Sequence, residues 1–171
     1  TYEKLDPVRF IGNYSTGKMG FSLAEECASR GAEVVLVAGP VSLKTNHPNI
    51  ARIDVESAEE MYNAALNAFV DADVAILCAA VADYRPLDRS STKMKRDGNM
   101  MNVTLVPNKD IAQALGKMKK SNQQLIGFAL ETDDEEANAL KKIARKNLDY
   151  IVLNSLNDKG AGFRYNTNKI A

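Results

Sequence analysis

A glycine-rich turn near the N-terminus is the first part of this sequence whose residue types and spacing could do chemistry. Gly12, Gly17 and Lys18 nearly fit the P-loop spacing of a glycine, four residues and then Gly-Lys. Met19, however, stands where a P-loop has Ser or Thr to hold a metal, so a true P-loop is disfavoured. A glycine-rich turn that enters a helix can still bind anions through its N–H groups and the helix dipole. The alternative is an ordinary glycine turn with a Ser or Thr cap.

Asn13 is the unusual residue of this turn. A short amide side chain before a helix is often only a cap. Here Ser15 or Thr16 could cap the helix instead. We therefore predict that Asn13 is free to face a ligand, with helix capping as the alternative.

The stretch from Ala79 to Tyr84 is the second candidate, because it begins at the end of the most apolar predicted strand. Its small side chains would let a flat ring approach the backbone, and Asp83 could meet a ribose hydroxyl or a metal. A solvated turn carboxylate is the alternative for Asp83. In doubly wound sheets, ligands bind outside the carboxyl ends of the strands, which is where this stretch would lie.

A basic segment follows that stretch. Between Arg85 and Arg96, five basic residues stand against the single acid Asp88, an excess of +4 in a chain of zero net charge. The segment is a long insertion after a strand, where mobile lids occur. We predict a basic lid over about residues 85–106 that neutralises phosphates, with rapid amide exchange at residues 86–100 in the absence of ligand. A solvated charged face is the alternative.

A cationic helix is the fourth candidate. Lys142 and Lys146 lie four residues apart and would share one face of the helix, which could meet a polyphosphate. The alternative is that these cations only offset the dipole at the helix C-terminus.

These candidates need elements to position them, and the sequence alternates helix and strand patterns. Ser57 and Glu60 form a capping box at the second helix, and Gly31 is placed to end the first. The alternation points to parallel βαβ units, so we expect one doubly wound α/β domain over residues 1–171. The predicted helices are residues 15–30, 57–70, 110–119 and 135–147, and the predicted strands are residues 33–38, 50–55, 74–80, 125–130 and 150–153.

Composition excludes several classes of protein. The chain has 171 residues, 45% of them apolar, which is enough for one globular domain with a sizeable core. Lys plus Arg and Asp plus Glu both number 22, and this balance argues against a nucleic-acid binder. One histidine in a polar loop and two distant cysteines argue against Ser-His or Cys-His catalysis and a zinc ribbon. No apolar run approaches the ~20 residues of a membrane span, and no signal peptide is visible. We therefore expect a cytoplasmic protein without membrane contact.

Six motifs follow one another along nearly the whole chain. They occupy residues 6–20, 79–85, 93–96, 108–111, 127–132 and 146–149, and they read Asp-Pro-Val-Arg-Phe-Ile-Gly-Asn-Tyr-Ser-Thr-Gly-Lys-Met-Gly, Ala-Ala-Val-Ala-Asp-Tyr-Arg, Lys-Met-Lys-Arg, Asn-Lys-Asp-Ile, Gly-Phe-Ala-Leu-Glu-Thr and Lys-Asn-Leu-Asp. In this order they resemble the motifs of phosphopantothenoylcysteine synthetase. Six ordered motifs are far more specific than any one glycine loop.

The resemblance implies a Rossmann-like ligase of coenzyme A biosynthesis that joins 4′-phosphopantothenate to cysteine through an amide bond. Bacterial members use CTP with Mg²⁺, form an acyl-cytidylate and pyrophosphate, and then let cysteine displace CMP. The resemblance also implies a homodimer with its site near the subunit interface, and in many bacteria a fused flavin-dependent phosphopantothenoylcysteine decarboxylase. Eukaryotic relatives use ATP. We predict CTP, because the tight turn at residues 79–83 could offer paired polar groups to a small pyrimidine edge.

Residue roles follow from the same resemblance. Asn13 would hold the acyl-cytidylate, and Lys95, in the lid, would be needed for turnover. Phosphates would hold most of the Mg²⁺ coordination, with Asp83 as one candidate ligand. The residues that would bind the nucleotide are Ser15, Gly17, Leu77, Cys78, Ala79, Asp83, Lys95, Asn108, Lys109, Asp110, Ile111, Phe128, Lys142 and Lys146.

The chain departs from the family pattern at the lid and at both ends. Arg96 replaces the usual final Lys of the lid motif, which keeps the charge. The strand expected before Thr1, which would be central to the sheet, and the chain end expected after Asn168 are missing, so we expect a fragment.

Two other functions stay open. A NAD- or flavin-binding oxidoreductase predicts a Gly-x-Gly-x-x-Gly turn after a strand, which the sequence lacks. A non-catalytic Rossmann-like module would need neither the basic lid nor the cationic helix face.

Overall fold

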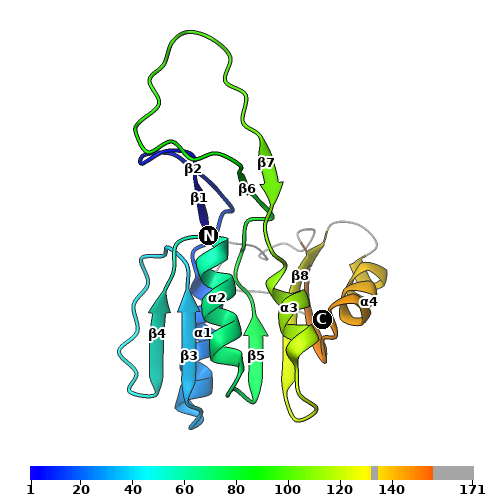
Figure 1. The fold of residues 1–171 in the computed structure, drawn as a ribbon. Coiled ribbons are helices and arrows are strands. Elements are labelled where there is room, and N and C mark those ends of the chain that lie inside the picture. The colour runs from blue at the N-terminus through cyan, green and yellow to red at the C-terminus, as the bar shows by residue number, and fades with distance from the viewer. Residues whose placement is uncertain (132–134, 156–171) are drawn as a thin grey trace.

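The protein alternates helices with mostly parallel strands (Figure 1). The computed structural model describes residues 1–131 and 135–155. In chain order its elements are β1 (Tyr2–Lys4), β2 (Phe10–Gly12), α1 (Lys18–Ser29), β3 (Val34–Ala38), β4 (Ile50–Asp54), α2 (Ala58–Phe69), β5 (Val74–Leu77), β6 (Tyr84–Pro86), β7 (Leu105–Pro107), α3 (Ile111–Met118), β8 (Gln124–Glu131), α4 (Glu135–Lys146) and β9 (Tyr150–Ser155). Two features predicted from the sequence lie outside the described residues, namely the end of the fifth motif at Thr132 and the chain end after Asn168.

The parallel strands form two groups. Strands β5, β8 and β9 make a parallel sheet with β8 in the middle, and β3 pairs with β4, also in parallel. Helices α1 and α2 both contact β3, with α2 in front of the strands and α1 behind them in Figure 1. This arrangement confirms the predicted α/β fold with parallel βαβ units. Two antiparallel pairs, β1–β2 and β6–β7, were not predicted, because strands of three residues carry no readable hydrophobic period.

The core lies where α2 and α3 pack against β8. Leu125 of β8 is fully buried, and Phe69 and Leu115 cover it from the two helices. Each of these helices repeats apolar residues every three to four positions, so that one face of each is apolar. The buried core cluster comprises Met61, Phe69, Ile111, Leu115, Leu125 and Leu148.

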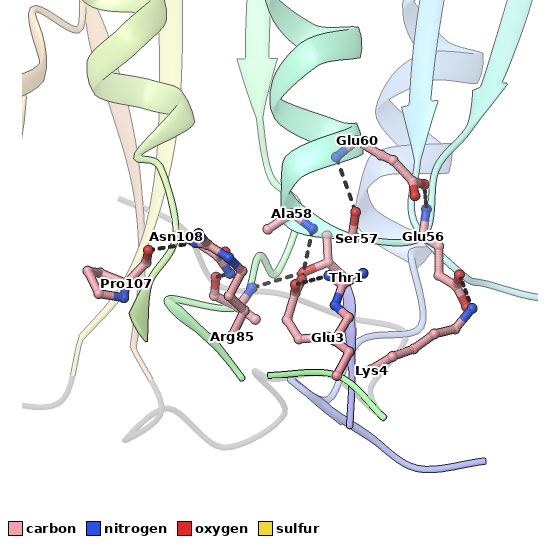
Figure 2. Close-up of polar contacts among 12 residues, drawn as sticks. Thr1, Glu3, Lys4, Glu56, Ser57, Ala58, Glu60, Arg85, Pro107 and Asn108 are labelled. Carbon is pink, nitrogen blue, oxygen red and sulfur yellow. Dashed lines mark hydrogen bonds and ion pairs between the residues drawn. The ribbon is translucent and has the colours of Figure 1, made fainter. Parts of the chain in front are cut away.

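Local signals in the sequence place the helix ends. At the start of α2, the Ser57 hydroxyl accepts a hydrogen bond from the Glu60 amide at 3.2 Å (Figure 2). The Glu60 carboxylate accepts from the Glu56 amide at 2.7 Å rather than from Ser57, so the predicted capping box is shifted by one residue on that side. At the end of α1, Gly31 has a φ of +93°, as expected of a glycine that follows a helix.

A gap separates the two groups of parallel strands. Among the described residues, no hydrogen-bonded ladder joins β3 to β5. A cavity of about 2210 Å³ runs between them and is lined by residues of both strands. Thr1 lies across one end of this gap, where its backbone nitrogen donates to the Ala80 carbonyl and its hydroxyl accepts from the Ala82 amide, both at 3.0 Å. Within the described part of the chain, no helix combines the length and apolarity needed to cross a bilayer.

Candidate active site

The cavity reaches the carboxyl ends of the parallel strands and gathers the predicted site residues there. Its lining contains Asn13 and every predicted nucleotide-binding residue except Lys95. These residues come from the turn before α1, the end of β5, the start of α3, and the facing sides of β8 and α4. A typical ligand cavity measures about 300–1,000 Å³, so this cavity is larger than a ligand site alone, and it includes the space between β3 and β5.

The glycine turn begins α1 later than predicted. The helix starts at Lys18 rather than Ser15, because Gly17 stands at its N-cap with a φ of +76°. No side chain caps the helix. The Ser15 hydroxyl accepts from the Gly17 amide at 3.3 Å and the Thr16 hydroxyl accepts from the Lys18 amide at 3.4 Å, but the N-cap is Gly17, so the alternative of a Ser or Thr N-cap is wrong. Met19 and Gly20, in the first turn of α1, line the cavity, and the N-cap Gly17 offers no side chain to this end of the helix, which suits an anion.

Asn13 ties the glycine turn to the loop after β5. Its side-chain amide donates to the Val81 carbonyl at 3.0 Å, across 68 residues of sequence. Asn13 therefore has a structural partner that the sequence did not indicate, and its predicted contact with a ligand stays a prediction. The bond uses one of the two N–H groups of the amide, and the side chain remains exposed at the cavity.

The loop after β5 begins earlier than predicted, because β5 ends at Leu77 and not at residue 80. Asn108 fastens this loop, since its side chain donates to the Ala82 carbonyl and its backbone amide donates to the Asp83 carbonyl, both at 2.8 Å. Arg85 in turn donates to the Asn108 side-chain oxygen at 3.2 Å and to the Pro107 carbonyl at 2.8 Å (Figure 2). The carbonyls of residues 80–83 all accept hydrogen bonds and the Ala82 amide donates to Thr1, so the other N–H groups of the loop are the better candidates to contact a ligand.

The cations predicted to meet phosphates already have partners in this structure. Lys146 lies 3.0 Å from one carboxylate oxygen of Asp110, whose other oxygen caps α3 through the Gln113 amide. Burial opposes ionisation of Asp110, but these hydrogen bonds and the positive charge of Lys146 hold the pKa of the carboxyl below its usual value. Lys109 pairs with Glu59 at 3.7 Å. Lys142 lines the cavity.

The walls of the cavity are less polar than the end where the lysines and Asp110 lie. Leu77, Phe128 and Ile111 line it, together with the half-buried thiol of Cys78. Burial raises the pKa of the Cys78 thiol, so this sulfur stays protonated and does not act as a nucleophile near neutral pH.

No cluster of three metal-ligating side chains occurs within the described ranges. Asp83 is exposed at the cavity, and its role as a metal ligand stays a prediction.

The lid is a long loop that rises from the β6–β7 pair, away from the sheet (Figure 1). Lys95 is exposed on it and does not line the cavity. The lid is not free along its whole length, because the Ser90 amide donates to the Leu5 carbonyl at 2.9 Å and the Met94 amide donates to Asp6 at 3.1 Å. Rapid exchange therefore stays a prediction for the amides beyond Met94.

The whole chain, residues 1–171, matches the family model described as the DNA/pantothenate metabolism flavoprotein C-terminal domain. This chain belongs to that family. The match confirms the family resemblance that the six ordered motifs indicated.

Relatives of this flavoprotein C-terminal domain include longer proteins. A protein of an unknown prokaryotic organism, named cysteine/cysteine sulfinic acid decarboxylase, is 58% identical over 99% of this chain and 47% of its own length. The coenzyme A biosynthesis bifunctional protein CoaBC of Vibrio vulnificus (strain YJ016) is 44% identical over 99% of this chain and 43% of its own length. That of Bacillus subtilis (strain 168) is 46% identical over 98% and 41%. The chain thus spans less than half the length of these relatives.

Solved structures share the fold. The crystal structure of the C-terminal domain of CoaBC has a TM-score of 0.79 and 43% identity, over 90% of this chain and 72% of that chain. The DNA/pantothenate metabolism flavoprotein from Streptococcus pneumoniae has a TM-score of 0.83 at 24% identity, over 100% of this chain and 88% of that chain. The second likeness shows the fold alone, and both agree with the Rossmann-like arrangement.

Several polar residues that hold the elements around the site were not predicted from the sequence. Glu3 and Asp6 are buried acids on the β1–β2 hairpin, and Thr1 holds the loop after β5. The Asp-Pro pair at positions 6 and 7 is a turn signal that could have indicated the hairpin. No local signal could have indicated Glu3, whose carboxylate accepts from the Ala58 amide 55 residues away at 2.8 Å (Figure 2).

Proposed function

We propose that this domain is a ligase that joins 4′-phosphopantothenate to cysteine with CTP through an acyl-cytidylate intermediate. The names of the CoaBC relatives, at 44–46% identity, support a step of coenzyme A biosynthesis. One observation carries the proposal: a single cavity joins the turn at Asn13, the loop at residues 79–83, residues 108–111 and the cationic face of α4. The decarboxylase name of the 58% relative applies to a protein of which this chain covers 47%.

In the first half-step, the phosphopantothenate carboxylate would attack the α-phosphorus of CTP, form the acyl-cytidylate and release pyrophosphate. Both reactants are anions, so positive charge at the phosphates would lower the barrier. Lys146 supplies such charge beside the cavity, where the phosphates would compete with Asp110 for it. Mg²⁺ would arrive with the nucleotide. Since Mg²⁺ is usually bound by one or two carboxylates together with phosphates, an exposed carboxylate at the cavity such as Asp83 fits it.

In the second half-step, the amine of cysteine would attack the acyl carbonyl and displace CMP. Negative charge then develops on the carbonyl oxygen, and the N–H of Asn13 that does not bind Val81 could donate to it. Lys95 lies outside the cavity, so it would reach the reacting groups only when the lid closes. Closure would also keep water away from a hydrolysable intermediate.

We also propose the partners that the family resemblance implied. These are a second copy of the chain near the site and a fused flavin-dependent decarboxylase domain. The bifunctional name of the CoaBC relatives, and the 43% of the Vibrio vulnificus protein that this chain covers, support the fused domain.

We propose a cytoplasmic location as well. The free thiols of Cys27 and Cys78 suit the reducing cytoplasm.

We further propose that a strand preceding Thr1 lies between β3 and β5. Both strands are parallel members of the fold, yet no ladder joins them in the described chain, and the cavity between them is apolar along its strands. Thr1 lies across one end of the gap, so a strand leading into it would run parallel to its neighbours. Such a strand would pair the open edges of β3 and β5.

Nucleotide choice tests the proposed function. With phosphopantothenate and cysteine, pyrophosphate release should be at least about tenfold faster with CTP than with ATP, because a loop that hydrogen-bonds one base leaves polar groups unpaired with another. The measurement is a coupled pyrophosphate assay at matched nucleotide concentrations. Equal turnover with the two nucleotides would refute CTP as the specific co-substrate.

A thermal-shift comparison with CTP, ATP and NAD separates the other functions. A ligand that binds the folded state raises the melting temperature. The proposed ligase is stabilised by CTP, whereas stabilisation by NAD alone would indicate an oxidoreductase. A chain that none of the three stabilises would fit a non-catalytic module.

A further inference from the structure

The β1–β2 hairpin holds a buried carboxylate at its turn. Asp6 is 2% exposed, and one of its carboxylate oxygens accepts hydrogen bonds from the backbone amides of Val8 and Arg9, both at 2.8 Å. This pattern is an Asx turn, in which an aspartate side chain orders the backbone that follows it. It accounts for only one of the two carboxylate oxygens.

The other carboxylate oxygen of Asp6 faces the lid. It accepts from the Arg9 guanidinium, through Nε at 2.9 Å and Nη2 at 2.6 Å, and from the backbone amide of Met94 at 3.1 Å. The same guanidinium Nη2 also donates to the Met94 carbonyl at 2.6 Å. Asp6 and Arg9 together therefore bind both the amide and the carbonyl of one lid residue, 88 residues away in the sequence.

Asp6 is ionised in this arrangement. Its burial acts to raise the pKa, but the hydrogen bonds from Val8, Arg9 and Met94 together hold the pKa of the carboxyl well below its usual value. Because the pKa is lowered, Asp6 keeps its charge and its hydrogen bonds as the pH falls through the range in which an ordinary aspartate becomes protonated. They are lost only in strong acid.

Two weaker contacts join the same hairpin to the lid. The Ser90 amide donates to the Leu5 carbonyl at 2.9 Å, and Arg89 lies 3.9 Å from the buried carboxylate of Glu3. The lid is thus held at the β6–β7 pair, along the hairpin and at Met94. The bonds at Met94 split it into two shorter loops, which restricts the conformations open to each.

We propose that Asp6, with Arg9, is a positioning residue that anchors the lid at Met94 and thereby sets the reach of Lys95. Lys95 directly follows Met94, so its Cα lies about 3.8 Å from that of the anchored residue and moves with it. The role assigned to Lys95 rests on the proposed function, whereas the anchor itself rests on the hydrogen bonds. Asp6 lies outside the cavity lining and acts only through the lid.

The substitution Asp6→Asn should keep the hydrogen bonds of the Asx turn and remove those that hold the lid. The amide oxygen can still accept from Val8 and Arg9, but an NH₂ group replaces the oxygen that bound Arg9 and Met94. Trypsin should then cut the lid at Lys93, Lys95 or Arg96 roughly 10- to 100-fold faster than in the unmodified protein, the range expected from losing hydrogen bonds to a charged group. Amide exchange at Met94 should accelerate by a similar factor.

Ligation provides the second readout. In Asp6→Asn, kcat should fall about tenfold or more with little change in the KM for CTP, because the cavity is unaltered and only the delivery of Lys95 is impaired. The acyl-cytidylate should accumulate when cysteine is added, as it should in Lys95→Gln. A residue that merely stabilised the fold would lower kcat without this accumulation.

Two further variants keep the test decisive. Asp88→Asn makes the same chemical change at an exposed lid position and should leave cleavage and ligation unchanged. Arg9→Lys keeps the Asx turn but removes the planar fork that binds Asp6 and Met94 together, so it should reproduce the faster cleavage if Asp6→Asn does not fold. If neither variant is cut faster than Asp88→Asn, the anchor is wrong whatever the activity shows. If cleavage accelerates but even the unmodified protein forms no acyl-cytidylate, the proposed function fails and the anchor stands.

Discussion

Replacing Asn13 by Asp is expected to lower ligation by roughly 10²–10³, the usual cost of losing one donor to a developing oxyanion. The structure adds a second reason for a large effect. The Asn13 amide donates to the Val81 carbonyl at 3.0 Å, and a carboxylate there would set two oxygen acceptors against each other. It would also add negative charge where phosphates are expected to bind. Because this charge would repel the phosphates before the oxyanion donor is needed, the loss should appear already in the first half-step, as little or no acyl-cytidylate in a quench with labelled CTP and no cysteine.

Lys95→Gln should fail at a different point of the reaction. Lys95 does not line the cavity, so activation of phosphopantothenate should still yield some acyl-cytidylate. Transfer to cysteine should be slow, because the cation delivered by the lid is missing. The same quench, followed by a cysteine chase, distinguishes the two variants. In Asn13→Asp the label should remain in CTP, whereas in Lys95→Gln it should remain in the acyl-cytidylate.

Asn46→Asp is the matched control for Asn13→Asp, since Asn46 is an exposed loop residue outside the cavity lining. It should ligate at the rate of the unmodified protein. Should Asn13→Asp also run within a few-fold of that rate, the proposed catalytic role is wrong and Asn13 only connects the glycine turn to the loop after β5.

Gly116→Ala is expected to give the largest loss of stability. A Cβ at this position would overlap the backbone carbonyl oxygen of Lys146 and lie 2.9 Å from its carbon, because α3 and α4 cross closely there. Alanine favours a helix by about 1 kcal/mol over glycine. Overpacking against backbone, which cannot rotate aside, costs about 3 kcal/mol. The free energy of unfolding should therefore fall by about 2 kcal/mol, and the melting temperature should fall by about 4–8 °C.

The same substitution should reach the site. Separating α3 from α4 would pull Lys146 from Asp110, which now lies 3.0 Å away, so ligation should weaken together with stability. Lys117→Ala on the same helix is exposed and should change the melting temperature by less than about 2 °C. An unchanged melting temperature in Gly116→Ala would show that the two helices can separate without cost.

The sequence by itself determined the order of the main elements and the ends of several. Apolar periodicity located the four helices, and Ser57 and Gly31 marked two helix ends, because capping and a positive φ depend on residues next to one another. Continuous apolar runs likewise located β3, β5 and β8. These signals are local, and local signals can be read without coordinates.

Only the tertiary structure decided which polar groups meet. Asn13 binds Val81 across 68 residues, and Asp6 binds Met94 across 88. Lys146 is paired with Asp110 rather than free for a phosphate. A side chain's type limits what it can bind, but its partner depends on which strands and loops the fold brings together. For that reason the residues of the proposed site could be named from the sequence, whereas the hydrogen bonds that fix them and hold the lid are properties of the folded chain.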